Sequence, residues 1–127
     1  KGKMRFTQRT IEIAKGSESR IITQYQLKSW KDMTSITPDD LHTVIEHTLS
    51  DLDRSKPPIV HCSAGLGRTG TLLAALAIKN QLPDAETTEK AIAHLRSRTT
   101  GRHSRMVYTT NQMNLVNAYE KYIQAQN

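Results

Sequence analysis

Alternating apolar and polar residues near the start of the chain predict a β-hairpin. Residues 5–13 alternate from Phe6 onward, and residues 20–28 carry a second alternating, β-branched run. A period of two with β-branched residues is typical of strands. The intervening residues 15–19, Lys-Gly-Ser-Glu-Ser, have the composition of a turn. We therefore expect two antiparallel strands joined by a tight turn.

Helical spacing dominates the rest of the chain. A first helix is expected from Pro38, with Thr37 as its N-cap and two acidic residues in its first turn. A second begins at Thr69 or Gly70 and is apolar nearly all round, as buried helices are. A third, capped by Asp84 or Thr87, runs to about residue 98, and a last one covers residues 106–124.

A short apolar segment, residues 58–61, separates the first two helices and predicts a third strand. The expected order is thus β-β-α-β-α-α-α. This order predicts an α/β fold, with a mixed twisted sheet flanked by helices and residues 62–67 as the loop between the third strand and the second helix.

Composition narrows the class of protein. The 127 residues are one domain's worth, 36% are hydrophobic and 24% are charged, which excludes a disordered or collagen-like chain. No apolar run approaches the roughly 20 residues of a membrane span, so no membrane segment is expected. The single cysteine excludes an internal disulfide and a multi-cysteine zinc site, and it suggests a reducing compartment.

The formal net charge of +6 is spread along the chain rather than gathered in one run. Its richest stretch is Arg96, Arg98, Arg102, His103 and Arg105. We interpret this stretch as a solvated loop with flanking helix ends, because no aromatic residues alternate with the charges as nucleic-acid stacking requires. Attraction of an anionic substrate is the remaining alternative. No nucleic-acid partner and no metal or other cofactor are expected.

The strongest chemical signal is residues 61–70, His-Cys-Ser-Ala-Gly-Leu-Gly-Arg-Thr-Gly. A glycine-containing loop between a strand and a helix turns successive N–H groups toward an anion, and the helix N-terminus adds partial positive charge. Such surroundings lower a thiol pKa from about 8.5, so Cys62 is expected to be a thiolate. Arg68, six positions later, has a planar fork that suits two phosphate oxygens. Phosphoryl transfer from oxygen to sulfur follows as the expected reaction.

Two other loop motifs fit less well. Residues 65–70 also match the dinucleotide pattern G-x-G-x-x-G, but only helices are expected after Gly70, where that fold needs another strand ending in an acid. A Walker loop needs a lysine that is missing here.

Residues 61–70 resemble the signature loop of the protein tyrosine phosphatases. Two further segments extend the resemblance: residues 20–32, with Trp30-Lys31-Asp32, resemble the strand and mobile acid loop of the family, and residues 106–112 resemble its glutamine-containing loop. The resemblance implies a phosphatase-like fold that hydrolyses phosphotyrosine in proteins through a phosphocysteine.

The resemblance also implies a role for each matching residue. Cys62 matches the nucleophile, Asp32 the general acid, Thr69 the hydroxyl that stabilises the thiolate, and Gln112 the glutamine that places water. His61 and Trp30 match supporting residues. The phosphate cradle corresponds to Ser63, Ala64, Gly65, Leu66, Gly67 and Arg68.

The chain departs from the family pattern in three places. Lys31 stands where the family has a proline in the acid loop, and Met33 and Thr34 replace the residues that usually follow the aspartate. Tyr108 stands where it has a first glutamine, which predicts either slower hydrolysis or transfer to other acceptors.

The family's tyrosine-specific domains are about twice as long as this chain. Residues 1–127 are therefore expected to be the C-terminal part of such a domain, with its N-terminal half as a possible partner and with an unfinished sheet edge or helix face. Two alternative functions stay open: a module that binds phosphotyrosine without cleaving it, and a dual-specificity phosphatase. The expected compartment is the cytoplasm, either of the cell itself or of a host that receives a bacterial effector.

Overall fold

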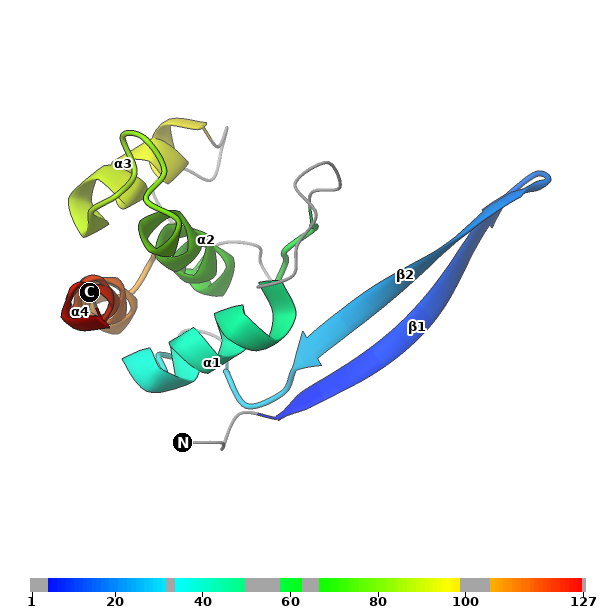
Figure 1. Cartoon of the computed structure of the whole chain (residues 1–127), viewed down its shortest axis with the longest axis horizontal. Coiled ribbons are helices and arrows are strands. Elements are labelled where there is room, and N and C mark those ends of the chain that lie inside the picture. The colour runs from blue at the N-terminus through cyan, green and yellow to red at the C-terminus, as the bar shows by residue number, and fades with distance from the viewer. Residues whose placement is uncertain (1–4, 32–33, 50–57, 63–66, 99–105, 127) are drawn as a thin grey trace.

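The computed structural model describes residues 5–31, 34–49, 58–62, 67–98 and 106–126. Its elements are a hairpin and four helices, shown in Figure 1. The strands are β1 (Phe6–Lys15) and β2 (Glu18–Leu27). The helices are α1 (Pro38–Leu49), α2 (Gly67–Lys79), α3 (Thr88–Arg98) and α4 (Thr110–Gln126). Within this part of the chain, no helix is long and apolar enough to cross a membrane.

The predicted hairpin is confirmed. β1 and β2 pair antiparallel over their whole length, from Phe6 opposite Leu27 to Lys15 opposite Glu18. Gly16 has φ +62° at the first of the two loop positions, which L side chains adopt only with strain and which a type II′ turn requires. The strand pair extends away from the helices in Figure 1.

Side-chain caps explain where two of the helices begin. At α1, the Thr37 hydroxyl accepts a hydrogen bond from Asp40 N (3.0 Å), as expected for its N-cap. At α3, the Thr87 hydroxyl does the same for Lys90 N (3.3 Å), so Thr87 and not Asp84 is the cap. α2 begins at Gly67, two residues before the expected start at Thr69.

The expected start of the last helix at residue 106 is wrong. Val107 has φ +59°, which is incompatible with a right-handed helix and costs a β-branched residue on the order of 1–3 kcal/mol. The helix instead begins at Thr110, with Thr109 as its cap: the Thr109 hydroxyl accepts from Gln112 N at 3.1 Å. Residues 106–109 are therefore a separate connecting segment.

The α/β class is confirmed, but the expected mixed sheet is not found in the part of the chain described here. Its sheet contains β1 and β2 alone, and residues 58–62 form no strand before α2. A strand needs an adjacent strand edge to satisfy its backbone groups, and residues 58–62 do not pair with the outer edge of either hairpin strand. Ile59, in the segment expected to be a strand, is 90% exposed.

α2 is the centre of the helical body and contacts α1, α3 and α4 (Figure 1). Its buried residues face two core clusters: Ala74, Ala77 and Ile78 pack with residues of α3 and α4, whereas Ala75 packs with Trp30 and with residues of α1 and α4. This central position means that the N-terminus of α2 is held from several sides. Among the described residues, the largest side chains that are fully buried are those of Tyr119, Leu41, Ile45, Ile78, Gln112, Val107, Val116 and Thr71.

The hairpin joins this body at its base. His47, in the last turn of α1, stacks on Phe6 with ring centroids 4.6 Å apart and meets Tyr25 edge-on at 5.6 Å. Further out along the strands, Ile13 and Ile21 are 52% and 71% exposed. Apolar side chains thus remain on the hairpin surface; the prediction that a missing half of the domain covers such a face stays a prediction.

Candidate active site

The segment around Trp30 is anchored in the core. Trp30 is 5% exposed and packs against α1, α2 and α4. Its indole Nε1 donates to the carbonyl of Thr34 (2.9 Å), and Thr34 N donates to the carbonyl of Lys31 (3.2 Å). The two ends of the predicted acid loop are therefore held close together on either side of residues 32–33, which lie outside the described part.

Cys62 directly contacts the first turn of α2. The hydroxyl of Thr69 donates to Cys62 Sγ at 3.1 Å. Thr69 is 7% exposed, whereas Cys62 is only partly buried. A donor from a helix N-terminus stabilises a thiolate more than a thiol, because a hydrogen bond to a charged group is the stronger one.

We expect Thr69→Ala to slow alkylation of Cys62 by iodoacetamide at pH 7 by about 10-fold, since a hydrogen bond to a charged group contributes about 1.5–3 kcal/mol. Thr69→Ser, which keeps the hydroxyl, is the matched control and should react nearly as fast as the parent chain. Equal rates for all three proteins would show that the 3.1 Å contact does not stabilise the thiolate.

Arg68 connects the start of α2 to the Trp30 segment. Its Nη1 donates to the carbonyl of Trp30 at 2.8 Å, across 38 positions of sequence. The guanidinium predicted to bind phosphate is thus fixed to the residue that begins the predicted acid loop. A shift of the Arg68 guanidinium would therefore also displace the Trp30 carbonyl, and the reverse.

Gln112 connects residues 106–112 to the other two segments of the site. This residue is fully buried, and its Oε1 accepts from Tyr108 N (3.0 Å) and Thr109 N (3.2 Å). Together with the Thr109 cap, this is a capping box, in which residue N3 of the helix bonds back to the cap. Its Nε2 donates to the carbonyl of Thr34 at 3.2 Å.

Gly67 provides the space for this arrangement. A Cβ at position 67 would lie 2.5 Å from Gln112 Oε1. The absence of a side chain at the first residue of α2 therefore allows the buried amide of Gln112 to lie directly against that turn. Three segments far apart in the sequence meet at this point: Trp30 with Thr34, residues 67–69, and residues 106–112.

The sequence-predicted site residues thus divide into three groups. Six of them belong to connected contacts around the start of α2: Cys62, Gly67, Arg68, Thr69, Trp30 and Gln112. His61 is exposed, and its supporting role stays a prediction. Outside the described residues lie Asp32, Ser63, Ala64, Gly65 and Leu66.

Two contacts at the site were not expected from sequence. The carbonyl of Thr34 accepts from both Trp30 Nε1 and Gln112 Nε2. Arg96, expected in a solvated stretch, instead donates to the carbonyls of Met106 and Val107. No sequence signal marks a backbone carbonyl as an acceptor, so these contacts could be found only in the structure.

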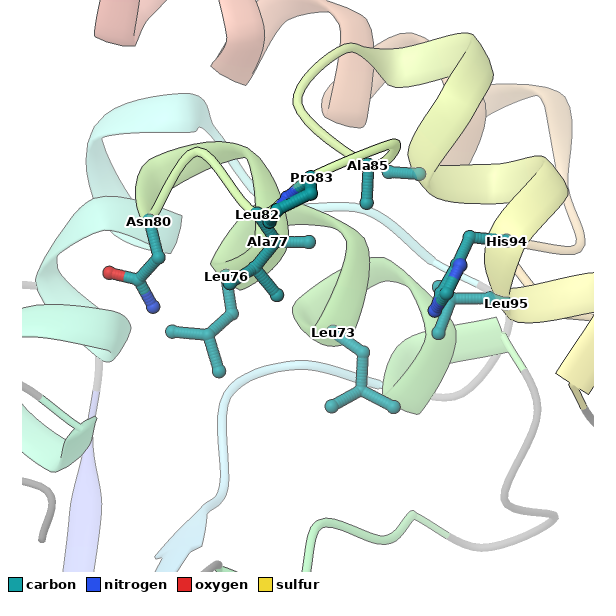
Figure 2. Close-up of a pocket in the computed structure, with 10 residues that line it drawn as sticks. Leu73, Leu76, Ala77, Asn80, Leu82, Pro83, Ala85, His94 and Leu95 are labelled. Atoms are coloured by element: carbon teal, nitrogen blue, oxygen red, sulfur yellow. The ribbon is translucent and has the colours of Figure 1, made fainter. Parts of the chain in front are cut away.

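A separate apolar pocket of about 450 Å³ lies between α2 and α3 (Figure 2). Leu73, Leu76, His94 and Leu95 are among the residues that line it. None of the sequence-predicted site residues is in its lining. Within the described ranges, no group of three or more His, Cys, Asp and Glu side chains is arranged to hold a metal ion.

A family comparison accounts for the motifs that meet here. The family model "Protein-tyrosine phosphatase" matches residues 1–124, nearly the whole chain. The chain therefore belongs to the protein-tyrosine phosphatase family.

Several tyrosine-protein phosphatases are similar to parts of this chain. Tyrosine-protein phosphatase 69D of Drosophila melanogaster is 34% identical over 93 residues, which cover 64% of this chain and 6% of the relative. Tyrosine-protein phosphatase 1 of Dictyostelium discoideum is 38% identical over 84 residues, 58% of this chain and 16% of the relative. Human tyrosine-protein phosphatase non-receptor type 13 is 43% identical over 65 residues, 50% of this chain and 3% of the relative. The chain thus spans only a small part of each of these relatives, from 3% to 16% of their length.

Proposed function

We propose that this chain catalyses the hydrolysis of phosphotyrosine in proteins, in two steps and through a phosphocysteine. The observation that carries the proposal is the 3.1 Å hydrogen bond from Thr69 to Cys62 Sγ at the N-terminus of α2. The sulfur of Cys62 is partly exposed, and it accepts this hydrogen bond at the positive end of the α2 dipole. This is the environment in which a cysteine acts as a nucleophile.

In the first step, the Cys62 thiolate attacks phosphorus. The S–P bond forms while the bond from phosphorus to the phenolic oxygen breaks, and Asp32 gives its proton to that oxygen. Arg68 and the amides of the loop before α2 bind the three remaining oxygens, whose charge grows in the transition state. The first products are the phosphocysteine and the free tyrosine side chain.

In the second step, water attacks the phosphocysteine. Asp32, now ionised, takes a proton from the water as the O–P bond forms. The S–P bond breaks, inorganic phosphate leaves, and the hydrogen bond from Thr69 stabilises the thiolate that is regenerated. The contacts of Gln112 with Thr34 and the start of α2 support a role at this same place.

The proposed substrates are proteins that carry phosphotyrosine, in a reducing compartment such as the cytosol, where a catalytic thiol survives. The relatives named above are tyrosine-protein phosphatases by name, which supports this substrate class.

Trapping of the covalent intermediate tests the proposal. The chain is mixed with a phosphotyrosine peptide, quenched in acid within milliseconds, digested and analysed by mass spectrometry. We expect a phosphoryl group on the peptide that contains Cys62, and inorganic phosphate that accumulates at longer times in the presence of a chelator. Saturable peptide binding without either product would instead assign the chain to the alternative class, a phosphotyrosine-binding module. Phosphate release that stops on addition of the chelator would overturn the thiolate mechanism.

A further inference from the structure

We propose that Arg96 on α3 is a positioning residue of this site: it holds the backbone of residues 106–107, and thereby holds Gln112 against Thr34 and the first turn of α2. The consequence for catalysis rests on the proposed function. The consequence for the structure of the site does not, and the two are tested separately below.

Arg96 is bound to two consecutive carbonyls. Its Nε donates to the carbonyl of Met106 (3.2 Å) and its Nη2 to that of Val107 (3.1 Å). Met106 and Val107 are 4% and 0% exposed. Backbone acceptors in a buried segment need partners, and one planar guanidinium supplies both with fixed relative geometry.

The segment that Arg96 holds has an unfavourable conformation of its own. The φ of +59° at Val107 lies in the left-handed region, which surrounding contacts must impose. From the other side, the segment lies against Gly70 of α2, where a Cβ would come within 2.6 Å of Val107 N. Residues 106–107 are thus clamped between the Arg96 side chain and the backbone of α2.

Gln112 depends on this clamp. The next two N–H groups along the chain, those of Tyr108 and Thr109, donate to Gln112 Oε1. They orient the amide so that Nε2 reaches the carbonyl of Thr34 (3.2 Å). Because Gln112 is fully buried, a shift of the segment would leave its amide groups without partners.

The end of this series of contacts is the predicted acid loop. The Thr34 carbonyl that Gln112 reaches also accepts from Trp30 Nε1, and the Trp30 carbonyl accepts from Arg68. Loss of the Arg96 contacts should therefore loosen the contacts of Thr34, although the two Arg96 hydrogen bonds end on Met106 and Val107 and not on a predicted site residue.

The first test needs no enzymatic activity. Trp30 is the one tryptophan of the chain, so its indole N–H gives a single assignable ¹H–¹⁵N signal. We expect Arg96→Met and Gln112→Leu to shift this signal in the same direction. Arg9→Met is the control, because it makes the same change of charge as Arg96→Met. It removes an arginine that donates to two glutamines on the hairpin, and it should leave the indole signal unchanged.

The second test measures catalysis with aryl phosphates of graded leaving-group pKa. We expect Arg96→Met to lower kcat by about 10-fold for phenyl phosphate and much less for 4-nitrophenyl phosphate, since only the poorer leaving group depends strongly on a positioned acid. Arg96→Lys, which keeps the charge but lacks the planar fork, should recover part of the loss.

A second variant separates the proposed role of Arg96 from a general loss of stability. Gly70→Ala leaves Arg96 in place but pushes residues 106–107 from the α2 side, and it should reproduce both effects. An indole signal unchanged in Arg96→Met and in Gly70→Ala, with only the melting temperature lowered, would overturn the inference. A wild-type chain that hydrolyses neither ester would contradict the proposed function, and the indole shifts would still decide the role of Arg96.

Discussion

Replacement of Cys62 by serine is expected to lower kcat for aryl phosphate hydrolysis by at least about 10⁴-fold, the order of loss found when a covalent nucleophile is removed. A serine hydroxyl stays protonated at neutral pH, and the Thr69 donor that faces Cys62 Sγ cannot make it an alkoxide. Binding of a phosphotyrosine peptide should persist, because Arg68 and the helix N-terminus are unchanged. Steady-state kinetics and titration calorimetry measure the two quantities.

The matched comparison for this variant is Cys62→Ala, which also lacks the nucleophile but leaves more room. Both should be inactive, and both should retain peptide binding. Activity that survives in either variant would mean that a different group, or a contaminating enzyme, is responsible. Loss of binding together with activity would instead show that the sulfur is part of the fold.

We expect Asp32→Ala to reduce kcat by roughly 10²- to 10⁴-fold for substrates with poor leaving groups, which is the contribution of a general acid. The loss should be far smaller for 4-nitrophenyl phosphate, whose leaving oxygen needs little protonation. The variant should also lose the fall in activity at high pH, since an acid that must be protonated stops working as it ionises.

Two controls define the Asp32 experiment. Glu12→Ala removes an exposed carboxylate from β1 and should leave kcat unchanged. Asp32→Asn keeps the size of the side chain without the acidic proton and should behave as Asp32→Ala does. An unchanged leaving-group dependence in both Asp32 variants would remove that residue from the mechanism and direct attention to another acid.

Local features of this protein were readable from its sequence. The hairpin follows from alternation around a glycine that can take φ +62°, and α1 begins where a threonine followed by proline predicts a cap. These features depend on residues within a few positions of one another. The H-C-x5-R-T-G segment is local in the same sense, since its chemistry depends on which groups lie next to one cysteine.

Elsewhere, local patterns were misleading. Residues 58–61 have the composition of a strand, yet they pair with neither hairpin strand in the described part of the chain. Residues 106–109 continue a helical pattern, but Val107 packs against α2 in a left-handed conformation and delays α4 until Thr110. In both cases the backbone depended on contacts remote in sequence, which are made at Val107 and are missing at residues 58–61.

The sequence by itself determined the hairpin and the cap of α1, and it predicted Cys62 as the nucleophile with Arg68 and Thr69 beside it. Only the tertiary structure decided that Gln112 reaches Thr34, that Arg68 bonds the carbonyl of Trp30, and that Arg96 bonds the segment before α4. The physical reason is the nature of the acceptors. Each of these contacts ends on a backbone carbonyl, which every residue possesses, so the choice among them depends on how the helices pack around α2.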